Sequence, residues 1–325
     1  MASRKYKAPG KAHRKGMTLV QMMRMFPSEE AAIKWFESVL WDGKRVCGKC
    51  GSERTREASH PKMPYWCTDC RSYFSIRTGT PMQQSKIPLQ KWAIAIYLCI
   101  TSLKSVSSMK LHRDIGVSQA SAWFMLHRIR EAWAGSDTGP RLQGPVEVDE
   151  TYFGGKRANM SLAKRATLEG RGPVDMTAVV GMKDRASNKV RARRVDRTDA
   201  ATLQGFVFEN ADRDAEVFTD DARAYQGLPN HETVKHSVLE YVRGMAHTNG
   251  VESFWSMLKR AHKGTFHKLS PKHLDRYVQE FAAKHNMRES DTLTQMRDTV
   301  ARLVGRRLMH RDLIADNGLP SGARS

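Results

Sequence analysis

Apolar residues recur at helical spacing in the first part of the chain. A helix is predicted to begin after Ser28, whose side chain suits an N-cap, and its apolar positions are Ala32, Trp35, Phe36, Val39 and Leu40. A second helix is predicted after Pro88, with a core-facing stripe of Leu89, Trp92, Ala93, Ile96, Ile100 and Leu103. The pattern therefore predicts an N-terminal region with packed helices.

Two shorter helices are predicted next, over 106–113 and 118–133, and the turn between them contains Gly116. This order is typical of a helix-turn-helix, whose second helix enters a DNA groove. The second helix has a predicted buried side of Ala122, Met125, Leu126, Ile129 and Trp133. Its predicted DNA side then consists of Gln119, His127, Arg128 and Arg130. A plain helical hairpin is the alternative.

The pattern changes after 135–144, a segment rich in Gly, Ser, Thr and Pro that we take as a domain boundary. Strands are predicted beyond it over 146–155, 176–182, 190–195, 215–220 and 234–238. Helices are predicted over 198–209, 249–261 and 271–284. This order of elements indicates a mixed α/β domain. The Lys- and Arg-rich segment 154–172 is expected to be a mobile loop that contacts DNA.

Four of the five cysteines form two pairs, Cys47 with Cys50 and Cys67 with Cys70, and 16 residues separate the pairs. Each C-x2-C turn offers two thiolates, and two such turns complete a tetrahedral zinc site. Disulfides are disfavoured in a reducing compartment, and a redox pair needs only one such turn. The spacing therefore predicts a zinc ribbon with structural Zn²⁺. Cys99 lies in an apolar helical stretch and is expected to be a core residue.

The chain of 325 residues carries 54 Lys and Arg against 34 Asp and Glu, a formal net charge of +20. Such an excess favours a polyanionic partner, and we expect DNA; a generally basic surface is the alternative. The longest apolar run, Trp92 to Ile100, has nine residues, whereas a spanning helix needs about 20. No apolar signal segment is present in the first 17 residues. We therefore expect no membrane partner and a cytoplasmic, nucleoid-associated protein.

Three acids lie at positions suited to bind a cation. Asp149 lies in a predicted strand, Asp220 ends another, and Glu252 lies near the start of a predicted helix. A buried carboxylate is costly unless it is paired or binds a cation. Mg²⁺ prefers oxygen ligands, and enzymes that act on nucleic acids often hold two metals. The alternative is a set of surface ion pairs with the many Lys and Arg residues.

Four segments give the chain a family resemblance from about Phe26 to Arg288. They read VEVDETYFGGK over 146–156, FTDDARAY over 218–225, HTNGVESFWSMLKR over 247–260 and GTFHKLSPKHL over 264–274. Behind a four-cysteine zinc ribbon, these segments resemble the ISXO-like insertion-sequence transposases. The resemblance implies an RNase H-like catalytic core, a DDE-type transposase mechanism and Mg²⁺ or Mn²⁺ in the catalytic site.

By that resemblance, Asp149 is the first catalytic acid, on the first strand, and Asp220 is the second, at the end of the fourth. The third position is Glu252 or Asn249, because the family has both an Asn and a Glu in this stretch. We favour Glu252 because a carboxylate binds a hard dication better than an amide does. Its distance of 32 residues from Asp220 also fits the DDE pattern. Asp221 is a possible substitute for Asp220.

The same stretch supplies predicted DNA contacts. Lys259 follows Glu252 by seven residues, two helical turns, and is expected to bind phosphate near the cut, together with Arg260 and His247. A basic helix face on the surface is the alternative.

We expect four regions: a zinc ribbon with its preceding helix over 18–86, a helix-turn-helix region over 87–140, the RNase H-like DDE domain over 145–290, and a helical basic C-terminal tail over 291–325. The expected partners are terminal inverted repeats and target DNA, with a homo-oligomer in the DNA complex. Two rival functions are a zinc-ribbon DNA-binding regulator with an inactive RNase H-like domain, and a nuclease of the same fold.

Overall fold

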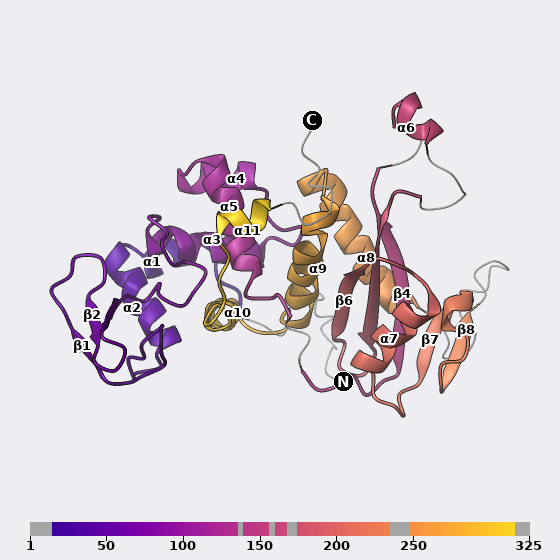
Figure 1. The fold of residues 1–325 in the computed structure, drawn as a ribbon, viewed down its shortest axis with the longest axis horizontal. Helices are drawn as coiled ribbons and strands as arrows, with labels where there is room; N and C mark the ends of the chain where they lie inside the picture. Colours follow the sequence, from indigo (N-terminus) through magenta and orange to yellow (C-terminus); the bar gives the residue numbers. More distant parts are fainter. Residues whose placement is uncertain (1–14, 136–138, 156–159, 168–173, 235–247, 316–325) are drawn as a thin grey trace, which may run out of the picture. The chain divides into compact units, whose positions relative to one another are not determined.

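The computed structural model describes residues 15–135, 139–155, 160–167, 174–234 and 248–315. The chain forms two compact units, shown in Figure 1. The first contains the residues up to Ala134 together with Met287–Ala315, and the second contains Gly135–Asn286. The second unit thus begins at the segment rich in Gly, Ser, Thr and Pro. Among the described residues, no helix combines the length and apolar character needed to cross a bilayer.

Most of the first unit is helical. Its helices are α1 (Leu19–Met25), α2 (Glu29–Leu40), α3 (Leu89–Thr101), α4 (Ser108–Ile115), α5 (Gln119–Arg130), α10 (Thr292–Ala301) and α11 (His310–Ile314). The predicted cap at Ser28 is confirmed, since its side chain accepts a backbone N–H group of α2, and Ser118 caps α5 in the same way. The prediction that Leu103 belongs to the buried stripe is wrong: α3 ends two residues earlier, and Leu103 is 71% exposed.

A small antiparallel sheet carries the zinc-ribbon segment. Its strands β1 (Thr55–Glu57), β2 (Tyr65–Cys67) and β3 (Ser72–Phe74) pair in sequence order. Tyr65 and Phe74 pack with Trp41 on the inner face of this sheet, next to the buried Cys47 and Cys67. The ribbon thus has a small aromatic core of its own.

The segment Met287–Ala315 returns to the first unit. The N–H of Gly305 donates to the carbonyl oxygen of Gly79 at 2.9 Å, and the guanidinium of Arg128 donates to the carbonyl oxygen of Leu308 at 3.3 Å. Helix α10 also contacts α2 and α3. The described part of the expected C-terminal tail therefore packs against the N-terminal unit, and it also contacts the turn that follows the ribbon.

The second unit is built on a five-stranded mixed sheet, which confirms the predicted α/β class. The strands are β4 (Val146–Phe153), β5 (Thr177–Asp184), β6 (Val190–Val195), β7 (Val217–Asp220) and β8 (His231–Val234), in the order β6-β5-β4-β7-β8. The first three are antiparallel neighbours, and β7 runs parallel to both β4 and β8. The fifth strand begins before its predicted range, of which residues 235–238 lie outside the described part.

Helices cover both faces of this sheet. On one face, α7 (Ala200–Asn210) packs Leu203, Phe206 and Val207 against Val146 and Val148. On the other, α8 (Asn249–Ala261) and α9 (Pro271–Asn286) pack against Val179, Val190 and Ala192. The predicted range of α8 is confirmed at both ends. Within the Lys- and Arg-rich segment, the structure describes a short helix, α6 (Leu162–Ala166).

Candidate active site and zinc centre

Asp149 and Asp220 lie on neighbouring parallel strands. Val146 pairs with Val217 and Glu147 with Phe218, so continuing this register by two residues places Asp149 opposite Asp220. Since Val146 and Val148 pack toward α7, side-chain alternation directs Asp149 toward the face that α8 covers. The two acids therefore share one face of the sheet, on its first and fourth strands in chain order.

Helix α8 brings Glu252 to the same face. Glu252 lies in the first turn of α8 and is exposed, and its Oε1 accepts a hydrogen bond from the Thr248 hydroxyl at 3.1 Å. Asp149 and Glu252 line a cavity of about 530 Å³. The other residues that line it are Glu150, Thr151, Trp255, Ser256, Lys259, Arg260 and Lys263. One wall is thus acidic and the other is a basic face of α8 and the turn that follows it.

A buried glutamate, Glu147, joins β4 to the start of α8. One carboxylate oxygen of Glu147 accepts the N–H of Val251 at 2.9 Å, and the other accepts from Nε of Arg185 at 2.8 Å. A Cβ on Gly250 would lie 2.6 Å from the Glu147 carboxylate, so glycine allows this close approach without displacing the carboxylate. Glu147 lies on the same strand face as Asp149 and binds the residue next to Glu252. It therefore fixes the first turn of α8 relative to the acids.

The sequence analysis missed Glu147. Two sequence features could have pointed to it: Glu147 is an acid on the same side of the strand as Asp149, two residues earlier, and a glycine follows Asn249 directly. Neither feature identifies its partner, since Val251 follows 104 residues later.

A second glycine lets α8 lie close to the sheet. A Cβ on Gly181 would lie 2.5 Å from the ring of Trp255, which packs on this point of β5. Because Trp255 also lines the cavity, the same contact positions one of its walls. Gly181 and Gly250 thus both allow close approach between α8 and the sheet.

The electrostatics of the site favour a bound cation. Burial, with the nearby charges of Glu150, Asp220 and Glu252, raises the pKa of Asp149 to about 7. Burial also raises the pKa of Glu150, which accepts a hydrogen bond from the Tyr225 hydroxyl at 2.7 Å. Several carboxylates therefore repel one another here, and a hard dication with oxygen ligands suits such a group. The donor set fits magnesium or manganese.

The remaining predicted residues of this site have different positions. Asn249 is exposed and is the first residue of α8, but the cavity lining contains Glu252 and not Asn249. Lys259 and Arg260 are exposed and line the cavity, as does Lys263, which the sequence analysis did not select. Asp221 is exposed beside Asp220. His247 lies outside the described residues.

The helix-turn-helix candidates separate into exposed and buried side chains. Gln119 is exposed and donates to the hydroxyl of Ser108 at 2.8 Å. Arg128 is half-buried, and desolvation lowers its pKa. His127 and Arg130 are 0% and 1% exposed, so the prediction that they lie on the DNA side of this helix is wrong.

The C-terminal segment contacts α5 at Phe124 and Arg128. The ring centroids of His310 and Phe124 lie 5.4 Å apart. The guanidinium of Arg128 lies over the same Phe124 ring, 4.0 Å from its centroid. Two residues of α5 are thus contacted by residues about 180 positions later in the chain.

The four ribbon cysteines converge on one point. All four Sγ atoms lie within 4.8 Å of one another, with Cys47 and Cys70 at 3.7 Å and Cys50 and Cys67 at 3.6 Å. Tetrahedral zinc with Zn–S bonds of about 2.3 Å separates its sulfurs by about 3.8 Å. The cluster could therefore hold zinc. Across the described ranges no other group of three such ligands is this tight, so the carboxylates of the acid site stand further apart than these thiols.

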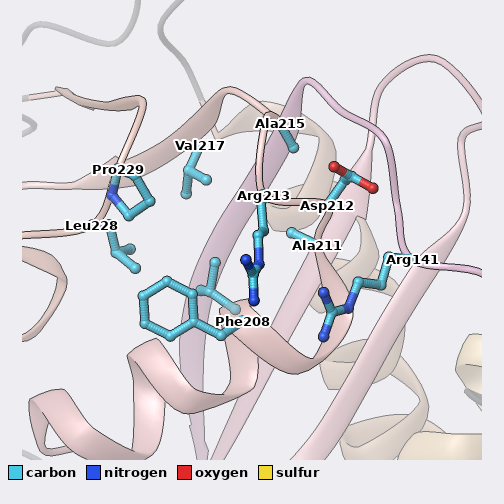
Figure 2. A pocket seen from close by; sticks show the side chains of 10 residues that line it. Arg141, Phe208, Ala211, Asp212, Arg213, Ala215, Val217, Leu228 and Pro229 are labelled. Carbon is cyan, nitrogen blue, oxygen red and sulfur yellow. The ribbon is translucent and has the colours of Figure 1, made fainter.

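A second cavity, of about 500 Å³, lies at Val217, the first residue of β7, whereas Asp220 ends that strand (Figure 2). Its lining is mainly apolar, with the exposed ring of Phe208, and Arg141 and Arg213 are its two basic residues. Asp212 is the single acid of this lining, so the cavity lacks the group of carboxylates that marks the first one.

Comparison with known proteins agrees with the fold and the site. Residues 141–286 match the family model described as ISXO2-like transposase domain. The second unit is therefore a transposase domain. The chain is also 30% identical over 285 residues to an uncharacterized protein in transposable element ISH50 of Halobacterium salinarum, covering 82% of this chain and 93% of that protein. No solved structure matches the chain. The chain belongs to the ISXO2-like transposase family, and so to the proteins of insertion sequences and other mobile elements.

Proposed function

We propose that the chain is a DDE-type transposase with an RNase H-like catalytic domain, which cuts the ends of an insertion sequence and joins each 3′-OH to target DNA. The observation that carries this proposal is the placement of Asp149 and Asp220 on one face of adjacent parallel strands, with Glu252 lining the same cavity as Asp149. The strand order, an antiparallel trio followed by two parallel strands, supports the fold assignment.

Asp149, Asp220 and Glu252 are the residues proposed to hold two Mg²⁺ or Mn²⁺ ions. Bound there, the metal would lower the pKa of the attacking water and offset the charge that develops on the phosphate. We favour Glu252 over Asn249 as the third ligand, because Glu252 lines the cavity and its charge contributes to the raised pKa of Asp149. Glu147 holds the turn of α8 on which both candidates lie.

The basic wall of the cavity is proposed to bind the DNA backbone. Lys259, Arg260 and Lys263 are exposed and line the same cavity as the acids, so a phosphodiester that contacts them lies next to the carboxylates. Water would first attack the phosphorus at the element end and release its 3′-OH. This 3′-OH would then attack a phosphorus of the target DNA held at the same site, and no covalent protein intermediate is needed. We assign recognition of the terminal repeats to the first unit. Because the two ends of the element must be brought together, we expect a homo-oligomer in the DNA complex.

Strand transfer with purified protein tests this function. The substrates are oligonucleotides carrying the terminal inverted repeat, with Mg²⁺, and the variants are Asp149→Asn, Asp220→Asn, Glu252→Gln and Asn249→Ala. Loss of joined product in the two Asp variants supports the transposase, and the other two decide the third ligand. Binding of the repeat without cleavage in any divalent metal would indicate a regulator, and cleavage without joining would indicate a nuclease.

A further inference from the structure

The outer face of the ribbon sheet carries a row of aligned side chains. Strand register places Arg56 opposite Trp66, and Trp66 opposite Tyr73. The rings of Trp66 and Tyr73 lie 4.7 Å apart at 70°. Tyr65, the neighbour of Trp66 on β2, packs toward Trp41 on the inner face, so alternation directs this row outward. Tyr73 is 41% exposed although it lies in the middle of β3.

His60 completes this face from the β1–β2 loop. Its ring centroid lies 5.1 Å from that of Tyr73, and its Nδ1 accepts the N–H groups of Lys62 at 3.2 Å and Met63 at 3.1 Å. Two backbone donors at Nδ1 leave the proton of a neutral ring on Nε2 and fix the ring plane. We call Arg56, His60, Trp66 and Tyr73 the aromatic face. Its rings are held in place by strand pairing and by the loop backbone.

The charge around the aromatic face suits an anionic partner. Over residues 43–78 the ribbon has eight Lys or Arg and three Asp or Glu. Each of these acids has an ion-pair partner: Glu53 with Lys44, Glu57 with Arg45 and Asp69 with Arg54. Within the described part of the chain, no ion pair joins Arg56 or Lys62 to an acid, and both are exposed. Two cations therefore flank the rings.

We propose that the aromatic face binds unpaired bases of single-stranded DNA. Exposed rings beside cations bind a single strand by stacking on its bases while the cations contact its phosphates. In a duplex, the base planes are stacked on one another and only their edges reach the grooves, so the rings could not stack on them. This site is separate from the acid cavity, and binding there does not require Asp149, Asp220 or Glu252 to be catalytic.

A role in stability alone is the competing explanation, since cross-strand aromatic pairs stabilise small sheets. The inner face already contains the aromatic core of Trp41, Tyr65 and Phe74 beside the cysteines. The outer rings therefore add to a sheet that has a packed side without them. The two explanations predict different results when the Tyr73 ring is removed.

The test measures binding of the zinc-loaded full chain to a fluorescent single-stranded oligonucleotide, and to its duplex, by anisotropy. Tyr73→Ala is expected to weaken single-strand binding by about tenfold and to leave duplex binding unchanged. Tyr73→Phe keeps the ring and is expected to bind like the wild type. The matched control is Phe208→Ala, which removes a 49% exposed ring from the second unit and is expected to change neither affinity.

Zinc content and melting temperature show whether Tyr73→Ala retains the fold. Unchanged single-strand binding in a folded Tyr73→Ala protein overturns the proposal, and so does an equal loss of duplex binding. Stronger binding of the ribo-oligonucleotide overturns the assignment to DNA. If Tyr73→Ala loses zinc, a second measurement decides instead. It compares how strongly the single strand quenches tryptophan fluorescence in the wild type and in Trp66→Phe. Equal quenching in the two proteins overturns the proposal.

Discussion

The two candidate metal sites differ in how the chain assembles them. The ribbon site takes its four thiols from two short turns, and the sulfurs already lie within bonding range of one ion. The acid site takes its carboxylates from two strands and a helix, and burial together with the neighbouring carboxylates raises the pKa of Asp149. Neutral thiols can converge before metal binds, whereas ionised carboxylates repel one another until a cation offsets their charge. We therefore expect the ribbon site to serve folding and the acid site to keep its charge for a ligand.

Zinc removal should give the largest effect and separates the two sites most clearly. Structural zinc contributes about 10–16 kcal/mol of apparent binding free energy in small domains. We expect Cys67→Ser, or a strong chelator, to unfold the ribbon while the second unit keeps its own melting transition in calorimetry. Ser59→Ala, at an exposed position of the β1–β2 loop, is the control. An unaltered first-unit transition after verified zinc loss would contradict a structural role for the ion.

Loss of one acid should have the opposite character, with a large effect on activity and no loss of the folded structure. Asp149→Asn is expected to reduce strand cleavage by about 10³-fold, as removal of a preorganised charge does. Far-UV circular dichroism should be unchanged. Cleavage at a wild-type rate would remove Asp149 from the mechanism.

The same variant has a predicted pH dependence in metal-free buffer. The pKa of Asp149 is about 7 in the fold and about 3.9 in an unfolded chain. The folded state thus holds this proton more tightly, so the charge of Asp149 destabilises the fold increasingly as pH rises from about 4 to about 7. Asp149→Asn should therefore melt above the wild type at about pH 8 and equally with it below about pH 4. A lower melting temperature at the higher pH would contradict the repulsion.

Sequence could predict what depends on local spacing. The cysteine set and the range of α8 follow from residues close together in the chain, and both are confirmed. The burial of His127 and Arg130 could not be predicted, because periodicity shows that a helix has a buried side but not how many neighbours cover it. Glu147 was missed for the same reason, since its partner lies in another element. Long-range packing decided each of these cases.

Gly250→Ala tests whether that packing positions the acid site. The new Cβ would lie 2.6 Å from the Glu147 carboxylate, so either this carboxylate or the first turn of α8 must shift, and either shift disturbs the hydrogen bond that Glu147 accepts from the Val251 N–H. A displacement of about 1 Å near the chemistry can reduce the rate about 10²-fold. Gly205→Ala is the matched control, because it lies inside α7 with no atom near its Cβ and should leave activity unchanged. Adding Glu147→Asp, which withdraws the carboxylate, should restore part of the rate lost in Gly250→Ala. Equal activity in both Gly→Ala variants would show that the Glu147 contact does not position Glu252.

The smallest expected effect distinguishes the basic wall of the cavity from the general positive charge. Lys263 lines the acid cavity, whereas Lys189 is exposed in the turn between β5 and β6, away from it. Each phosphate contact adds about 0.9 to the slope of log affinity against log salt. We therefore expect Lys263→Ala to lower this slope by about one for a terminal-repeat duplex and Lys189→Ala to leave it unchanged. Equal slopes in the two variants would mean that the net charge of +20 attracts DNA without a defined contact at the acid cavity. A selective loss at Lys263 would place the phosphate backbone beside the same carboxylates whose repulsion marks the site.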